Sequence, residues 1–118
     1  MLTMGSVVMG AADVRRAAVF WMRALGYVPR DGDVEDGWTV LVPAEGPGTA
    51  LSLGLSETPV QEHPRLHLDL YATDQAAEVE RLVALGAERV DWDLYEDDSD
   101  FVVLADTEGN RFCVIDKT

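Results

Sequence analysis

The stretch Leu66–Gly86, LHLDLYATDQAAEVERLVALG, predicts a strand that leads into a helix. In its first part, leucines alternate with polar or aromatic residues, which is the two-residue period of a strand. After Asp74 the apolar residues return every three or four positions, which is the period of a helix with one apolar face. Asp74 suits the N-cap of that helix, and Gly86 suits the left-handed position after its last turn.

The same pattern occurs earlier in the chain. The segment Ala24–Gly26 recurs as Ala84–Gly86, 60 residues further along. Asp13 and Asp74 stand 13 and 12 residues before the glycines that end these two segments. A short apolar run, Ser6–Gly10, takes the place of the strand in the first copy. Self-similarity of this kind indicates two copies of one supersecondary unit.

Three strand-like runs with turn residues between them follow each predicted helix. They are Tyr27–Arg30, Trp38–Val42 and Ala50–Leu55 in the first half, and Arg89–Trp92, Phe101–Ala105 and Arg111–Ile115 in the second. The predicted fold class is therefore α+β, with two βαβββ modules. We expect module one at 1–56, a linker at 57–64 and module two at 65–118. Neither module alone can cover both faces of its sheet, so we expect the two to pack as one domain.

Length and composition fit a single globular domain. The chain has 118 residues. Its charged fraction of 26% and its three Trp, three Tyr and three Phe argue against disorder. The longest apolar run, Ala17–Met22, is far shorter than the ~20 residues that span a bilayer. The first ten residues carry no basic charge, so no secretory signal is expected. One cysteine forms no intrachain disulfide. We expect a soluble, cytoplasmic protein.

The charge balance restricts the partners. Nine basic and 22 acidic residues give a net charge of −13, which opposes binding to nucleic acid or to an anionic membrane. The acidic residues gather at 31–36 and at 91–100. Two interpretations are open, because these clusters are either solvated loops or an acidic rim that attracts a cationic ligand.

Three motifs of the second half carry a resemblance to a known superfamily. They are His67–Asp74 (HLDLYATD), Leu85–Ala87 (LGA) and Asp106–Cys113 (DTEGNRFC). These motifs resemble the "His-strand, Asp, helix, Leu-Gly-Ala" and "Asp-x-x-Gly-Asn-x-x-Glu" patterns of the vicinal oxygen chelate superfamily, also called the glyoxalase/bleomycin resistance/dioxygenase fold. The resemblance covers nearly the whole chain. It implies a single glyoxalase-like domain, with a curled mixed sheet around a cup and the helices outside.

The resemblance also implies where a metal would bind, and three of the four expected ligands are absent. Metal-dependent members commonly use His, Glu, His and Glu from the first and last strand of each module. Here His67 matches one ligand, Ser6 replaces the other histidine, and Cys113 replaces the final glutamate. The remaining position falls near Ser52 or Leu53. His67 and Cys113 alone are fewer ligands than zinc uses, so we expect no metal and no other cofactor.

Strand alternation, combined with the family geometry, predicts which side chains line the cup. Leu66 and the leucines that follow it share the face that packs beneath a helix, and His67 begins the other face. Aromatic surface with a few convergent polar groups is typical of a small-molecule pocket. The expected ligand-binding residues are Ser6, Trp38, His67, Asp69, Tyr71, Phe101, Arg111 and Cys113.

Each polar candidate also has an interpretation without function. His67 is the candidate catalytic residue, but a histidine on a strand is also a common structural hydrogen-bonding group. Asp69 and Arg111 can form an ion pair that joins two strands. Cys113 can be a small buried hydrophobe. A nucleophilic pair of Cys113 and His67 needs hydrogen-bond contact and a third group that orients the base.

Three functions are compatible with these residues. The first is a metal-independent small-molecule-binding protein of the glyoxalase/bleomycin resistance type, which binds or sequesters an aromatic or cationic compound in the cup. The second is a glyoxalase- or dioxygenase-like lyase or isomerase that uses His67 as acid and base, or an atypical metal site. The third is a dimeric regulatory or partner-binding module. The resemblance implies a homodimer, since members commonly complete their cups by pairing.

Overall fold

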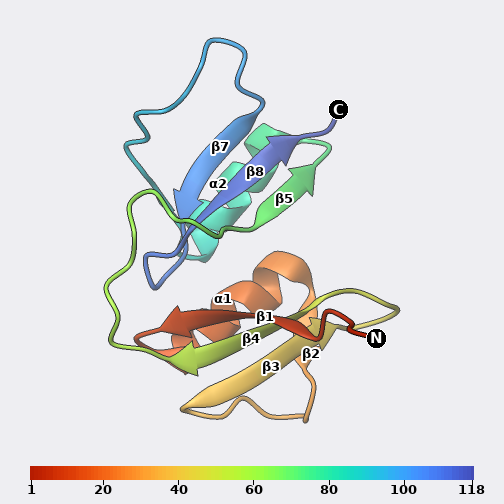
Figure 1. Cartoon of the computed structure of the whole chain (residues 1–118). Helices are drawn as coiled ribbons and strands as arrows, with labels where there is room; N and C mark the ends of the chain where they lie inside the picture. Colours follow the sequence, from red (N-terminus) through yellow and green to blue (C-terminus); the bar gives the residue numbers. More distant parts are fainter. The chain divides into compact units, whose positions relative to one another are not determined.

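The computed structural model describes residues 1–118, which form two compact units, Met1–Pro59 and Val60–Thr118 (Figure 1). The boundary between the units lies inside the predicted linker. Each unit contains one helix and four strands in the order strand, helix, strand, strand, strand. The predicted α+β class and the two βαβββ modules are therefore confirmed. That the modules pack as one domain stays a prediction.

The first unit has a four-stranded sheet in the order β1-β4-β3-β2, with α1 on one face. Its elements are β1 (Ser6–Ala11), α1 (Val14–Leu25), β2 (Tyr27–Pro29), β3 (Trp38–Pro43) and β4 (Ala50–Leu55). β1 runs parallel to β4, and the other neighbours are antiparallel. Phe20 and Trp21 of α1 are fully buried and meet edge to face, with ring centroids 5.0 Å apart.

The second unit repeats this arrangement, with the sheet order β5-β8-β7-β6. Its elements are β5 (Asp69–Ala72), α2 (Gln75–Leu85), β6 (Glu88–Arg89), β7 (Phe101–Ala105) and β8 (Arg111–Asp116). β5 is parallel to β8, and α2 packs against β8. Val79 and Leu82 of α2 are buried, as expected from their helical spacing. No helix in either unit has the length and apolar character needed to cross a membrane.

The registers of the two sheets are equivalent. In the first unit Val8 of β1 lies opposite Ser52 of β4, and in the second unit Asp69 of β5 lies opposite Cys113 of β8. The second pair stands 61 residues after the first at both positions. The internal repeat therefore extends from the order of the elements to the pairing of single residues.

The strand that contains His67 is shorter than predicted. β5 begins at Asp69, and Leu66 is 77% exposed, so Leu66 does not pack beneath the helix as expected. The reason is that Leu66 precedes the residues of this segment that pair with the sheet. The first sheet contact of the segment is the Leu68 carbonyl, which accepts a hydrogen bond from the Cys113 N–H at 2.9 Å.

The strand predicted at Arg89–Trp92 is also wrong in its extent. β6 contains only Glu88 and Arg89, which pair with the end of β7. Beyond them the chain leaves the sheet, and the Val103 N–H of β7 donates instead to the Tyr95 hydroxyl at 2.8 Å. A side-chain oxygen thus replaces a strand neighbour at this edge, and Trp92 lies in a loop.

Both helices have the caps that the sequence predicts. The Asp13 carboxylate accepts a hydrogen bond from the Arg16 N–H at 3.0 Å, and Asp74 accepts one from the Ala77 N–H at 3.1 Å. Gly26 ends α1 in the left-handed conformation, with φ +70°. Gly86 ends α2 with φ +122°, which is also a backbone conformation that side chains oppose.

We expect Gly26→Ala to lower the free energy of unfolding by about 1–2 kcal/mol, because a Cβ disfavours the left-handed conformation by that amount. Nothing lies within 4 Å of a Cβ at Gly26, so backbone strain is the only cost. Urea unfolding followed by circular dichroism measures the change. Gly37→Ala is the matched control, since Gly37 is equally uncrowded and its φ is not positive. Equal destabilisation by both substitutions would contradict this account.

Candidate functional site

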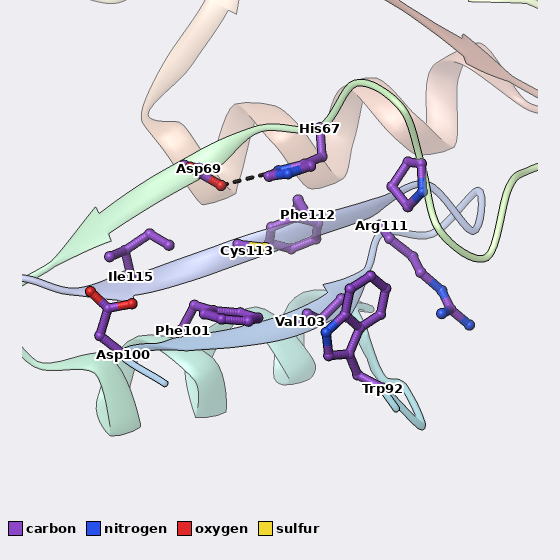
Figure 2. Close-up of a pocket in the computed structure, with 11 residues that line it drawn as sticks. His67, Asp69, Trp92, Asp100, Phe101, Val103, Arg111, Phe112, Cys113 and Ile115 are labelled. Atoms are coloured by element: carbon purple, nitrogen blue, oxygen red, sulfur yellow. Dashed lines mark ion pairs between the residues drawn. The ribbon is translucent and has the colours of Figure 1, made fainter. Parts of the chain in front are cut away.

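A pocket of about 350 Å³ lies in the second unit. Residues on β5, β7 and β8 share one face of the sheet, because Asp69 and Val103 both lie opposite Cys113, and Phe101 lies opposite Ile115. The loop 90–100 and the segment before β5 complete the wall. The lining residues are Pro64, His67, Asp69, Trp92, Asp100, Phe101, Val103, Arg111, Phe112, Cys113 and Ile115 (Figure 2).

Three polar groups meet on the strand face of the pocket. His67 Nδ1 lies 3.0 Å from Asp69 Oδ1, and the two side chains are 41% and 49% exposed (Figure 2). Cys113 is buried, and the Asp69 carboxylate lies beside its thiol. The ligand-type atoms of these three residues all lie within 4.8 Å of one another. The carboxylate is therefore the shared partner of an imidazole and a thiol.

The environment of Cys113 keeps its thiol protonated. Burial, followed by the charge and the hydrogen bond of Asp69, raises the pKa of the Cys113 thiol to about 11. A nucleophilic cysteine needs the opposite, because the thiolate is the reactive form. The structure thus pairs Cys113 with an anion that opposes thiolate formation, which does not support a nucleophilic Cys113–His67 pair.

Phe101 forms an aromatic wall that is supported from outside the pocket. Its ring lies against Tyr95 of the loop 90–100, with centroids 5.3 Å apart and planes tilted by 34°. The Tyr95 hydroxyl is held in turn by the Val103 N–H. This support fixes the loop to the edge of β7 and leaves Phe101 lining the pocket.

Trp92 forms a second aromatic wall, which is held by two cationic or ionisable side chains. The His63 ring lies 5.0 Å from the Trp92 ring, and the Arg111 guanidinium carbon lies 6.0 Å from its centroid. His63 Nε2 lies 2.7 Å from Asp93 Oδ1, and Arg111 Nη1 donates to the Glu62 carbonyl at 2.8 Å. The segment before β5 is thereby fixed to the loop 90–100.

The structure brings five of the eight predicted residues into this pocket, namely His67, Asp69, Phe101, Arg111 and Cys113. Tyr71 shares the β5 face, but it is 73% exposed, does not line the pocket, and lies 4.8 Å from the Lys117 ammonium. Asp69 pairs with His67, and Arg111 bonds to a carbonyl, so the structure does not show the ion pair considered between Asp69 and Arg111.

Ser6 and Trp38 belong to the first unit. Ser6 Oγ lies 2.6 Å from Ser52 Oγ, and Ser52 is buried. The Trp38 ring covers Gly54, where an added Cβ would lie 3.2 Å from it. The two serines thus satisfy each other at the positions where the resemblance expects metal ligands.

Sequence reasoning did not place Trp92 or Asp100 in the pocket. Trp92 was expected in a strand, and Asp100 was one acid among several in the cluster at 91–100. One signal was present, since an otherwise acidic segment contains both Trp92 and Tyr95. Large aromatic residues in a charged loop indicate packing against something, here β7 and the segment before β5.

The donor set does not fit the metal that the superfamily implies. The two serine hydroxyls of the first unit are hydrogen-bonded to each other. In the second unit Cys113 stands where the resemblance expects a glutamate, and it is buried. His67, Asp69 and Cys113 are close enough together to surround an ion, but they are not the His, Glu, His and Glu set that the resemblance implies. We derive no chemistry from a metal.

We expect iodoacetamide to modify Cys113 of the folded protein slowly at pH 8, with a rate that rises toward a midpoint near pH 11. Asp69→Asn removes the adjacent negative charge, so the thiol pKa falls and the rate at pH 8 rises by roughly tenfold per unit of pKa. Asp98→Asn removes the same charge outside the pocket and serves as the control. A midpoint near that of an unfolded cysteine would contradict the assignment.

The raised pKa of Cys113 also has a consequence for stability. The folded state retains the thiol proton more tightly than the unfolded chain, so this contribution is complete below the unfolded pKa and is lost as the pH rises toward 11. Cys113→Ser is expected to remove this part of the alkaline decline in the free energy of unfolding.

Comparison with known proteins identifies the family of the chain. The model of the glyoxalase-like domain matches residues 6–115. A glyoxalase/bleomycin resistance protein/dioxygenase family enzyme from Burkholderia phytofirmans PsJN has a TM-score of 0.72 at 17% identity, with 98% of each chain covered. The fosfomycin resistance protein FosX from Listeria monocytogenes has a TM-score of 0.73 at 14% identity, with 100% of this chain and 93% of that chain covered.

A mutant of FosX is known as a complex with Mn(II) and 1S,2S-dihydroxypropylphosphonic acid, and it has a TM-score of 0.72 at 13% identity. Similarity at these identities shows the fold alone. No curated protein matches the chain. Because the domain model spans nearly all of the sequence, the chain belongs to the glyoxalase-like domain family.

Proposed function

We propose that the chain binds a small aromatic or cationic compound in the pocket of the second unit, without a metal. The observation that carries the proposal is a partly exposed carboxylate, Asp69, in the same 350 Å³ pocket as the Phe101 ring. Such a pocket has the size and the mixture of apolar walls and few polar groups that small ligands need.

Charge supports a cationic guest. Asp69 and Asp100 both line the pocket, and the one basic lining residue, Arg111, already donates to the Glu62 carbonyl. The net charge of −13 attracts cations toward the protein. An ammonium group beside Asp69 would form a charge-assisted hydrogen bond, which is stronger than a neutral one.

A thermal-shift screen of aromatic amines, each paired with an uncharged analogue of the same shape, tests the proposal. A ligand that binds only the folded state raises the melting temperature. We expect the amines to bind more tightly than their analogues, and Asp69→Asn to weaken them by roughly 10- to 100-fold, since a hydrogen bond to a charged group contributes about 1.5–3 kcal/mol.

Asp98→Asn is the control for Asp69→Asn, because it changes the net charge equally outside the pocket. Each measurement is repeated in EDTA, which should leave the affinity unchanged if no metal takes part. Equal binding of the amines and their uncharged analogues would contradict the role of Asp69. Loss of binding in EDTA would contradict metal independence.

The contact between His67 and Asp69 favours a second candidate, a lyase or isomerase in which His67 acts as acid and base. His67 Nδ1 lies 3.0 Å from the Asp69 carboxylate, and a neutral ring with its proton on Nδ1 would keep its lone pair on Nε2, which is the arrangement of a positioned general base. Asp69 would then be a positioning residue that fixes the tautomer.

The ring nitrogens of His67 provide a direct test of this second candidate. We expect ¹⁵N chemical shifts to show the Nδ1–H tautomer in the neutral ring, and Asp69→Asn to reduce its population. If His67 is a base, carbonyl compounds with an acidic C–H should exchange that proton in D₂O, and His67→Gln should abolish the exchange. Tautomer selection without any exchange would leave His67 as a binding group and reject the enzymatic candidate.

A homodimer and a cytoplasmic location remain proposals. Light scattering at micromolar concentration distinguishes a dimer from the 12.9 kDa monomer. A pocket that binds no small molecule, in a protein that captures a protein partner, would instead favour the partner-binding module.

A further inference from the structure

Two carboxylates border the pocket from different strands. Asp69 belongs to β5, and Asp100 immediately precedes Phe101, the first residue of β7. Both residues line the pocket (Figure 2). The only ion-pair contact of Asp69 is with His67 Nδ1 at 3.0 Å, and an imidazole is charged only when it is protonated. The Asp100 carboxylate has no ion pair or hydrogen bond, since this residue makes its contacts through its backbone carbonyl.

No arginine or lysine of the second unit neutralises these two carboxylates. Arg111 is the one such residue that lines the pocket, and it lies over the Trp92 ring and donates to the Glu62 carbonyl. Lys117 does not line the pocket, and its ammonium lies 4.8 Å from the centroid of the Tyr71 ring. A guest with a single positive charge would therefore leave one carboxylate of the pocket without a cationic partner.

Asp100 is held in place by its backbone. Its carbonyl accepts hydrogen bonds from the Gln75 side chain of α2 at 3.0 Å and from the Asp116 N–H of β8 at 2.7 Å. The same Gln75 amide donates to the Val114 carbonyl at 2.9 Å, which joins α2 to β8. These contacts fix the position of Asp100 and leave its carboxylate available. A group positioned in this way loses less conformational entropy when a guest binds.

The register of the sheet separates the two carboxylates. β8 lies between β5 and β7, so the backbones of β5 and β7 are about 10 Å apart, which is two strand spacings. Asp69 lies opposite Cys113, whereas the Asp100 carbonyl bonds to Asp116, three residues further along β8, which adds roughly 10 Å along the strand. The two carboxylates therefore border different ends of the pocket, and they suit two cationic groups that are joined by a spacer.

Apolar side chains lie between these ends. Phe101 of β7 and Ile115 of β8 lie opposite each other, and both line the pocket. Figure 2 shows Ile115 between Asp69 and Asp100 in this view, with the Phe101 ring close by. Tyr95 supports that ring from outside, with centroids 5.3 Å apart. A short aromatic spacer fits such a surface.

We infer that the guest is dicationic, with one ammonium group at Asp69, a second at Asp100, and an apolar spacer of about one ring over Phe101 and Ile115. This inference rests on the proposed function and names the class of cation that the same pocket takes. Aromatic diamines belong to this class. Aromatic monoamines satisfy Asp69 alone, and amino acids would bring a second negative charge toward Asp100.

Calorimetric titration with matched probes tests the inference. The probes are para-xylylenediamine, the monoamine para-methylbenzylamine, which has nearly the same shape, and ortho-xylylenediamine, whose two ammonium groups lie close together. We expect para-xylylenediamine to bind roughly tenfold more tightly than the monoamine, as a second charge-assisted hydrogen bond implies, and the ortho isomer to gain less.

Three variants assign the gain to a residue. Asp100→Asn should remove the advantage of para-xylylenediamine and leave the monoamine unchanged, while Asp69→Asn should weaken both. Asp98→Asn is the control, because it changes the net charge equally outside the pocket and should leave the order of affinities unchanged. A diamine advantage that survives Asp100→Asn would come from the net charge of the protein and would contradict the inference.

A measurement on the unmodified protein covers the case in which Asp100→Asn does not fold. The side-chain carboxyl ¹³C resonances of Asp69 and Asp100 should both move with para-xylylenediamine, and only that of Asp69 should move with the monoamine. Monoamine binding that depends on Asp69, without any gain from a second ammonium group or response of Asp100, would contradict this inference alone. Failure of every probe to bind at millimolar concentration would contradict the proposed function as well.

Discussion

The pairing of β5 with β8 is the constraint on which the candidate site depends. It sets Asp69 opposite Cys113 and continues to the hydrogen bond between the Cys113 N–H and the Leu68 carbonyl. Because side chains alternate along a strand, this register turns His67, Asp69 and Cys113 toward the same face. A slip of one residue would turn Leu68 and Leu70 into the pocket instead, and the polar groups would be lost together.

The acidic residues of the segment at 91–100 lie in several different environments. Asp93 lies 2.7 Å from His63 Nε2, and this hydrogen bond lowers the pKa of the Asp93 carboxyl. Asp100 lines the pocket, and its carbonyl accepts hydrogen bonds from Gln75 and from the Asp116 N–H. Other acids of the segment are exposed to solvent. The cluster therefore contains solvated carboxylates, one carboxylate that contacts His63, and one residue, Asp100, that lines the pocket.

The features that sequence predicts well are those with local causes. The helix ends follow from Asp13, Asp74 and Gly26, whose capping contacts lie within a few residues of themselves. Trp92 could not be predicted in the same way. Its ring is held by His63 and Arg111, which are distant in sequence, and its loop exists because β6 ends early. Strand alternation likewise identifies the face of a side chain, but not which part of that face is hollow.

The two units have the same strand pairing but different side chains at equivalent positions. Val8 and Ser52 of the first unit occupy the register positions that Asp69 and Cys113 occupy in the second. In the first unit, the Ser6 and Ser52 hydroxyls satisfy each other at 2.6 Å, and no charge lies between them. Asp69 changes this arrangement, because it places a carboxylate 3.0 Å from the His67 ring and beside the buried Cys113 thiol. The two units therefore share one frame and differ in the chemistry that it carries, so similarity of fold alone does not identify a function.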